Sequence, residues 1–351
     1  MSSRSIPEIG ALAAISARIG SDPLLVQAAT GNTSIKIGDV MWIKASGQWL
    51  ARAQSDDIMI PVALSETRRR IAAHIDPAGQ STLLNGRALG TSVETAMHAV
   101  LPWPVVLHVH SVNTIAWAVR RDGERELETR LRGLEWKWIP FVPSGLPLAR
   151  AIEDALLDAP GTRVLVLANH GLVVCGEACE SADELLNEVE RRVAIEPREG
   201  AAPRWEILRK LTANGLWEIP EHDIVHGLAT DALSRHIVTA GVLYPCQAIF
   251  LTPQIRPFPS SVTLADLATA EEPFVLVEDS GIVVRPNLNP AATATLRGLA
   301  QIAKRVPASA PIQYLGEDQV RDLLCADVYH YRSLVEGNSS PVSPQSPVTT
   351  F

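Results

Sequence analysis

The sequence predicts an α/β fold in which a mixed, largely antiparallel sheet is flanked by helices and is followed by a smaller α/β region. Short apolar, β-branched segments alternate along the chain with segments of helical periodicity. Strands joined by short turns, in residues 31–44 and 274–285, favour antiparallel pairing over parallel pairing. A segment with Pro197, Gly200 and Pro203 reads as a linker between the two parts.

Length and composition limit the classes of protein to consider. The chain has 351 residues, enough for one large or two ordinary domains, with 46% hydrophobic and 20% charged residues. A net charge of −8 argues against a nucleic-acid or anionic-membrane partner. We find no apolar run of about 20 residues and no signal-peptide pattern. Four scattered cysteines do not suit a disulfide framework, so we expect a cytoplasmic protein.

The first part of the chain should alternate helices and strands. Apolar residues recur at helical spacing in residues 7–20, which predicts a helix. Small residues and a Gly-Asp turn indicate a hairpin at 31–44. Prolines precede a β-branched segment at 105–111, which we predict to be a strand. We predict further helices at 62–76, 94–101, 111–119, 147–157 and 181–193, and further strands ending near 143 and spanning 163–168 and 171–174. Cys175 and Cys179 have no second cysteine pair, and we interpret them as ordinary thiols.

The second part also mixes helices and strands. We predict helices at 205–214, 290–305 and 316–335, and a hairpin at 274–277 and 281–285. His222, Asp223 and His226 are close in sequence, but they fall in a predicted loop with no strand or helix to orient them. Residues 337–351, rich in Ser, Pro and Thr, should form a disordered tail. No Gly-x-Gly-x-x-Gly follows a predicted strand, so we expect no dinucleotide-binding domain.

Three histidines and a carboxylate stand at the ends of predicted elements. Side chains alternate along a strand, so His108 and His110 point the same way, about 6.6 Å apart, and can converge on one cation. His170 follows the strand at 163–168, and Glu94 begins a predicted helix, with His98 one turn further on the same face. Alone, His170 could be structural and Glu94 could complement the helix dipole. Together the pattern favours a catalytic metal site.

These motifs resemble those of the class II aldolase/adducin superfamily, above all its zinc-dependent sugar-phosphate aldolases. The likeness is greatest to the aldolase part of the rhamnulose-phosphate aldolase/short-chain dehydrogenase proteins. It covers about residues 10–195 and, more loosely, the chain to about 336. The matching stretches are Gly31-Asn32-Thr33-Ser34, Trp42 to Gly47, Ser92-Val93-Glu94-Thr95, His108-Val109-His110-Ser111 and Asn169-His170-Gly171-Leu172.

The resemblance implies a catalytic domain at residues 1–198, with a C-terminal α/β region of unknown role at 204–336. It implies substrate-phosphate binding by Asn32, Ser46, Gly47 and Ser92, whereas spacing alone fits turn residues as well. Where phosphate-binding relatives often carry a second serine before the glutamate, this chain has Val93. Lys44 could add charge there or be a solvated residue at a strand end.

The resemblance also implies a reaction. Zinc, or another divalent metal, held by His108, His110 and His170 would stabilise an enediolate, with Glu94 as the base. The leading hypothesis is cleavage of a ketose 1-phosphate to dihydroxyacetone phosphate and an aldehyde. Sugar-phosphate epimerisation, decarboxylation and a non-catalytic adducin-like binding role remain alternatives. The small-molecule substrate would be bound by a homo-oligomer, a tetramer in many relatives.

The family's proton donor to the aldehyde is often a tyrosine soon after the His-x-His strand. This chain has no tyrosine before Tyr244. The donor would then come from elsewhere in the chain or from a neighbouring subunit. Candidates in this chain are Glu124, Glu128, Glu135, Tyr329 and Tyr331.

Overall fold

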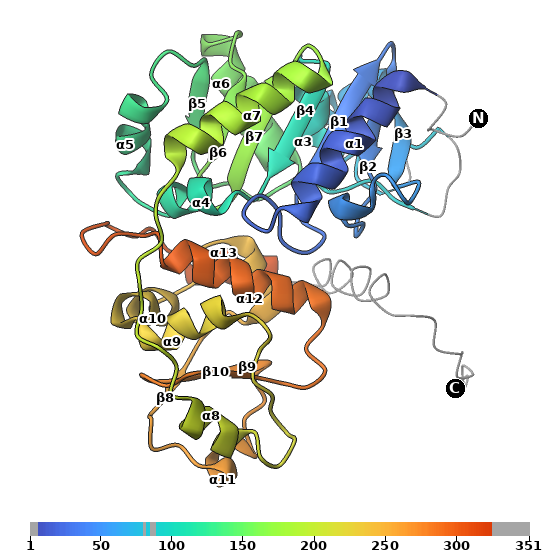
Figure 1. The fold of residues 1–351 in the computed structure, drawn as a ribbon. Coiled ribbons are helices and arrows are strands. Elements are labelled where there is room, and N and C mark those ends of the chain that lie inside the picture. The colour runs from blue at the N-terminus through green and yellow to red at the C-terminus, as the bar shows by residue number, and fades with distance from the viewer. Residues whose placement is uncertain (1–5, 80–81, 85–88, 325–351) are drawn as a thin grey trace, which may run out of the picture.

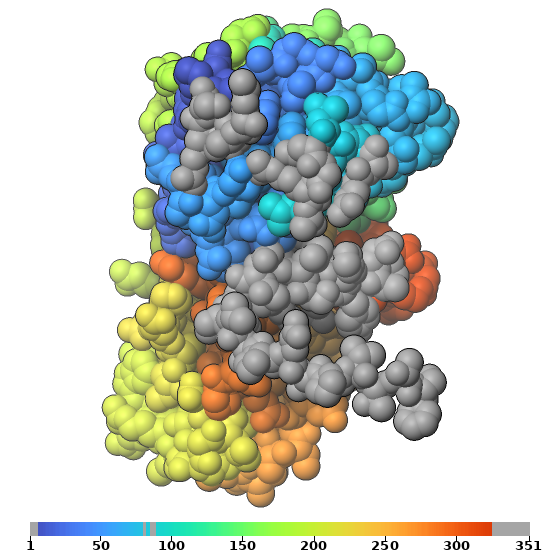
Figure 2. Space-filling view, turned by 90° about the vertical axis from the view of Figure 1, so that its right-hand side faces the viewer, coloured from blue at the N-terminus to red at the C-terminus, as the bar shows by residue number. Residues whose placement is uncertain are grey.

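The computed structural model describes residues 6–79, 82–84 and 89–324, which form two stacked parts (Figure 1). Helices of the first part are α1 (Pro7–Ser21), α2 (Leu64–Ala72), α3 (Thr95–Val100), α4 (Val112–Ala118), α5 (Gly123–Arg130), α6 (Leu146–Asp158) and α7 (Cys179–Val193). Its strands are β1 (Asn32–Ile37), β2 (Val40–Lys44), β3 (Met59–Ala63), β4 (Val105–Val109), β5 (Trp136–Ile139), β6 (Val164–Leu167) and β7 (Gly171–Gly176). In Figure 2 the same two parts are seen from the side, with the blue-to-cyan residues above the yellow-to-orange residues.

The first part is built on a seven-stranded sheet in the order β3-β2-β1-β4-β7-β6-β5. Every neighbouring pair is antiparallel except β5 and β6, which are parallel. The predicted mixed, largely antiparallel α/β fold is therefore confirmed. β4 lies in the middle, and its register places His108 opposite Asn32 of β1 on one side and opposite Val173 of β7 on the other.

The alternation of side chains along β4 decides which way its histidines face. Leu107 and Val109 enter the core shared with α1 and α7, whereas Val106 packs on the opposite face with Leu148 and Ile152 of α6. His108 follows the parity of Val106, so it faces the side of the sheet covered by α3 and α6. That is the side on which Glu94 immediately precedes α3.

The second part is the predicted smaller α/β region. Its helices are α8 (Trp205–Leu211), α9 (Gly227–Thr230), α10 (Ala232–Thr239), α11 (Leu264–Leu267), α12 (Pro290–Ala303) and α13 (Glu317–Leu323). Its strands β8 (Pro257–Phe258), β9 (Phe274–Val277) and β10 (Gly281–Val284) form a sheet in which β9 and β10 pair as the predicted hairpin. The predicted helix to 335 and tail at 337–351 extend beyond the described residues.

A hydrophobic core joins the two parts. Ile115 of α4 and Val119, the residue directly after it, lie in the first part and belong to the same buried cluster as Leu243, Leu299 and Ala303 of the second. Burying apolar area in common stabilises the contact between the two parts. The segment that follows the His-x-His strand is therefore packed directly against the C-terminal region.

Several elements differ from the sequence-based expectation: α5 and α9 to α11, together with β8, were not predicted. Strand β3 was not predicted, because Pro61 interrupts its apolar run, but β3 lies at the edge of the sheet, where a proline is tolerated. The predicted loop around His222 instead contains a 3-10 turn at Asp223–His226. There His226 is buried and its Nδ1 accepts a hydrogen bond from the Ile282 N–H (3.0 Å).

Among the described residues, no helix has both the length and the apolar character that a bilayer crossing requires.

Candidate metal centre

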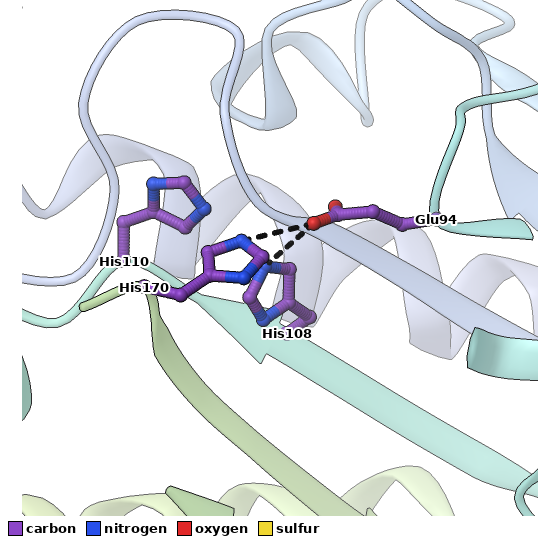
Figure 3. Close-up of side chains that lie close together, drawn as sticks. All are labelled: Glu94, His108, His110 and His170. Carbon is purple, nitrogen blue, oxygen red and sulfur yellow. Dashed lines mark ion pairs between the residues drawn. The ribbon is translucent and has the colours of Figure 1, made fainter. Parts of the chain in front are cut away.

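Glu94, His108, His110 and His170 converge in the first part of the molecule (Figure 3). Each offers one ligand atom, and these atoms all lie within 4.8 Å of one another. All four side chains are buried. The Oε1 atom of Glu94 is 3.0 Å from His170 Nε2 and 3.4 Å from His108 Nε2.

The surrounding backbone fixes these positions. His170 lies in the tight turn between β6 and β7, where Asn169 has a positive φ of 52°. Asparagine tolerates this left-handed conformation better than most residues. A Cβ atom at Gly171 would lie 2.5 Å from the Val109 carbonyl oxygen, so only glycine lets β7 approach β4 directly after His170.

The three imidazoles surround one point. Their ring centroids are separated by 5.0, 5.0 and 5.1 Å, with interplanar angles of 66, 81 and 85°. His108 Nδ1 is 3.0 Å from the Leu172 carbonyl, which only accepts, so Nδ1 carries the proton. That leaves a lone pair on Nε2, a buried atom that has no hydrogen-bond partner among the described residues and lies 3.4 Å from Glu94 Oε1.

This arrangement fits a divalent cation. An orphaned imidazole nitrogen with its other nitrogen anchored to a backbone carbonyl is typical of metal-binding histidines. Three imidazoles and one carboxylate suit zinc and other first-row divalent metals. The cluster could therefore bind a divalent metal ion.

Burial and neighbouring charges set the protonation states around the cluster. Burial by itself raises the pKa of Glu94, but His108 and His170 outweigh it and hold that pKa well below its usual range. Burial, reinforced by His108 and His170, lowers the pKa of His110 well below its usual range. An ionised carboxylate and a neutral imidazole are the forms that bind cations.

Asn32 links Glu94 to a polar chain beneath the site. Its Nδ2 donates to Glu94 Oε2 (2.5 Å), and its Oδ1 accepts from His98 Nε2. With Nε2 protonated, His98 Nδ1 accepts from the Ser34 hydroxyl (2.7 Å). Burial lowers the pKa of His98 well below its usual range, which agrees with a neutral ring. Asn32, predicted as a substrate ligand, thus has both ends of its side chain engaged by protein groups.

The other predicted substrate residues lie on two adjoining loops. The Ser46 N–H donates to the Gly90 carbonyl (3.0 Å), and Ala45 forms an isolated β-bridge with Thr91. Gly47 has a positive φ of 71°, and the Ser92 Oγ accepts from the Glu94 N–H (3.2 Å). Helix α3 begins one residue later than predicted, at Thr95, so Glu94 stands at its N-cap position. The Ser46 and Ser92 loops meet beside Glu94.

Several contacts of the site were not predicted. Ser144, from the segment after β5, places its Oγ 3.5 Å from Glu94 Oε1. Lys44 is buried, not solvated, and donates to the carbonyls of Ala29 (2.6 Å) and Gln48 (2.9 Å). Cys246, from the C-terminal region, lies with its Sγ 3.4 Å from His110 Nδ1. Such long-range contacts leave no signal in sequence spacing.

The candidate proton donors named from the sequence differ in where the structure places them. Glu124, Glu128 and Glu135 are exposed, and Glu135 pairs with Arg163 at 3.7 Å. Tyr329 and Tyr331 lie outside the described residues. Cys175 and Cys179 are free and buried, as expected of ordinary thiols.

Comparisons with known proteins match the first part of the chain. The class II aldolase and adducin N-terminal domain model matches residues 11–196. An uncharacterized oxidoreductase of Bacillus subtilis, YuxG, is 28% identical over 178 residues, covering 46% of this chain and 26% of that protein. This chain thus spans about a quarter of the length of that relative.

Two solved structures are also similar to part of this chain. A class II aldolase domain from Thermoplasma acidophilum covers 53% of this chain and 92% of its own, with 23% identity and a TM-score of 0.46. An L-fuculose-1-phosphate aldolase from Thermus thermophilus covers 52% and 92%, with 20% identity and a TM-score of 0.36. By the family match over more than half of its length, the chain belongs to the class II aldolase and adducin family.

Proposed function

We propose that this protein is a metal-dependent aldolase that cleaves a ketose 1-phosphate to dihydroxyacetone phosphate and an aldehyde. The observation that carries the proposal is the convergence of Glu94 and three histidines within 4.8 Å. Family membership supports it, because the matched family includes class II aldolases. In this proposal His108, His110 and His170 hold zinc or another divalent metal.

The metal and Glu94 would have separate tasks. A divalent cation bound by three imidazoles acts as a Lewis acid toward a carbonyl and its neighbouring hydroxyl. In the cleavage direction the C3–C4 bond would break with its electron pair passing to C3, and the C4 hydroxyl would give up its proton, directly or through water, to the ionised Glu94 carboxylate. Glu94 returns a proton to C3, and in the synthetic direction it removes that proton.

The hydrogen bond from Asn32 supports this role of Glu94. It occupies Oε2 and leaves Oε1 directed at His108 and His170, the side on which a metal-bound substrate would lie. A base held in one orientation loses less entropy on reaching the transition state. We therefore assign Asn32 chiefly to holding Glu94, and only indirectly to binding substrate.

We assign the substrate phosphate to the Ser46, Gly47 and Ser92 loops. Two hydroxyls and a glycine turn on adjoining loops suit an anion that accepts several hydrogen bonds. Ser92 is hydrogen-bonded to Glu94, and the Ser46 loop is hydrogen-bonded to the segment just before Ser92. A phosphate bound by these loops would therefore lie near the carbons that react at Glu94. A sugar phosphate is accordingly the proposed substrate class.

The remaining parts of the proposal concern the whole protein. We propose a catalytic domain at residues 1–198, a C-terminal region at 204–336 and a homotetramer, which light scattering of the purified protein would test. We also propose a cytoplasmic location, in keeping with the free thiols of Cys175, Cys179 and Cys246.

A panel of ketose 1-phosphates tests the proposed reaction. The zinc-loaded protein should release dihydroxyacetone phosphate from at least one of them. Glu94→Gln should lower kcat by about 10²–10⁴-fold, the usual contribution of a general acid–base, while retaining most of the metal. Epimerised product or released CO₂ without cleavage would replace the aldolase assignment, and absence of turnover with retained ligand binding would favour a binding protein.

A further inference from the structure

The C-terminal region reaches two of the three histidines of the metal centre. Asn169, next to His170, is hydrogen-bonded to this region, and Cys246 of this region contacts His110. These contacts come from a part of the chain that lies outside the match to the family domain, which ends at residue 196.

Asn169 is the more extensive of these links. Its Nδ2 donates to the carbonyls of Leu243 (2.8 Å) and Gln313 (2.7 Å), so both amide hydrogens are used. Only 1% of the residue is exposed, which makes each of these hydrogen bonds costly to lose. Two segments that are far apart in sequence thus converge on the residue that sets the turn before His170.

The second link acts on His110. Cys246 is buried and stands at the start of a π-helical turn, Gln247–Leu251. Gln247 braces the preceding segment, because its Oε1 accepts from the Leu243 N–H (2.9 Å) and its Nε2 donates to the Gly241 carbonyl (3.3 Å). The Cys246 thiol, next to this braced segment, lies against Nδ1 of His110, which leaves Nε2 to bind a cation.

Backbone contacts fix the same interface. The Gln313 N–H donates to the Val119 carbonyl at the end of α4, and the Arg121 N–H donates to the Pro311 carbonyl, both at 2.8 Å. Together with the shared core around α4, they hold residues 241–247 and 311–315 in a fixed place relative to the sheet. The C-terminal region therefore cannot move without disturbing the turns that carry the histidines.

We propose that the C-terminal region completes the metal centre, with Asn169 and Cys246 as positioning residues that orient His170 and His110 for metal binding. This inference rests on the proposed function, because it concerns the same metal centre. In this proposal, residues 204–324 contribute to metal binding by the first part of the chain.

Zinc affinity, measured in the full chain by competition with a chromogenic chelator, tests this. Asn169→Gly removes both hydrogen bonds but keeps the left-handed backbone accessible, and Cys246→Ala removes the thiol. Each should weaken zinc binding by about 10–100-fold, the usual effect of residues that orient metal ligands. The visible spectrum of the Co²⁺-substituted protein should also change, since it reports ligand geometry.

Arg305→Met is the matched control. Arg305 Nε donates to Asn113 Oδ1 (3.1 Å), a hydrogen bond between the two parts that touches none of the four site residues. This variant should lower the melting temperature and leave zinc affinity and the Co²⁺ spectrum unchanged. If all three variants lost zinc affinity to the same extent, the contacts of Asn169 and Cys246 would contribute only to the general stability of the fold. That result would overturn the proposal.

The outcomes also separate this inference from the proposed function. Wild-type zinc affinity in both Asn169→Gly and Cys246→Ala would overturn the positioning role and leave the aldolase proposal intact. Weakened zinc binding in these variants, in a wild-type protein that cleaves no ketose phosphate, would support the positioning role and overturn the aldolase. A wild-type protein that binds neither Zn²⁺ nor Co²⁺ would overturn both.

Discussion

Asn32 donates a hydrogen bond to Glu94 beneath the candidate metal centre, from Nδ2 to Oε2 at 2.5 Å. The two residues are 62 positions apart, and β1 brings them together because its first residue lies opposite His108 in the sheet. Glu94 is thereby held with its other oxygen toward the histidines.

Asn32→Leu should lower kcat strongly, because Glu94 loses the donor that orients it. The change also leaves buried polar groups without partners, at about 1–3 kcal/mol of stability. Ser34→Ala cuts the same chain one step further away, at His98, and should affect kcat much less. Steady-state kinetics and thermal unfolding of both variants check this, and equal kcat values for the two would contradict the role of Asn32.

Ser46→Ala should raise KM for a phosphorylated ketose by about 10–150-fold with little change in kcat, since one good hydrogen bond to a charged group contributes about 1.5–3 kcal/mol. KM for the unphosphorylated sugar should not change. Ser55→Ala, at an exposed serine in the following turn, is the control and should change neither value. A parallel rise in KM for both sugars would remove Ser46 from the phosphate site.

Gly171→Ala should unfold or strongly destabilise the first part of the chain, which contains the seven-stranded sheet, and abolish metal binding. The added Cβ would lie 2.5 Å from the Val109 carbonyl oxygen, so β7 would have to separate from β4 beside His108 and His170. Gly10→Ala provides the comparison, because a Cβ at that helical position would meet no atom of the described residues within 4 Å, so this change should be neutral or stabilising. Circular dichroism melts and metal analysis measure both effects.

Lys44 should make stability depend on pH. Burial lowers its pKa from 10.5 to about 7, with Glu94 opposing the shift. Between these two values the unfolded chain binds more protons than the folded chain, so the free energy of unfolding should rise with pH over that window. Lys44→Met should flatten this rise; denaturant unfolding from pH 7 to 10 measures it. An unchanged slope in the variant would show that Lys44 is not the group responsible.

Local patterns were enough to predict most strands of the central sheet, though not β3, and the cluster of four side chains. The alternation of His108 and His110, and the strand ends at His170 and Glu94, depend on spacings within single elements, and these four side chains do meet. The hairpins at 31–44 and 274–285 likewise follow from short-range turn chemistry.

Contacts between distant segments could not be predicted in this way. The sequence does not indicate that Lys44 is buried, because the two carbonyls that accept its hydrogen bonds come from separate loops. Asn32 fitted an anion-binding loop by its neighbours, and only the sheet register brings it to Glu94. Cys246 meets His110 across 136 residues through the packing of two parts of the chain. Periodicity carries no information on such pairings.

Elemental analysis of metal per chain, on the wild-type protein and on His170→Ala, tests the metal centre most directly. We expect about one divalent metal per wild-type chain, as a three-histidine catalytic zinc site holds, and its loss in the variant. A folded wild-type protein that contains no divalent metal and takes up none on reconstitution would contradict the assignment of the cluster as a metal centre.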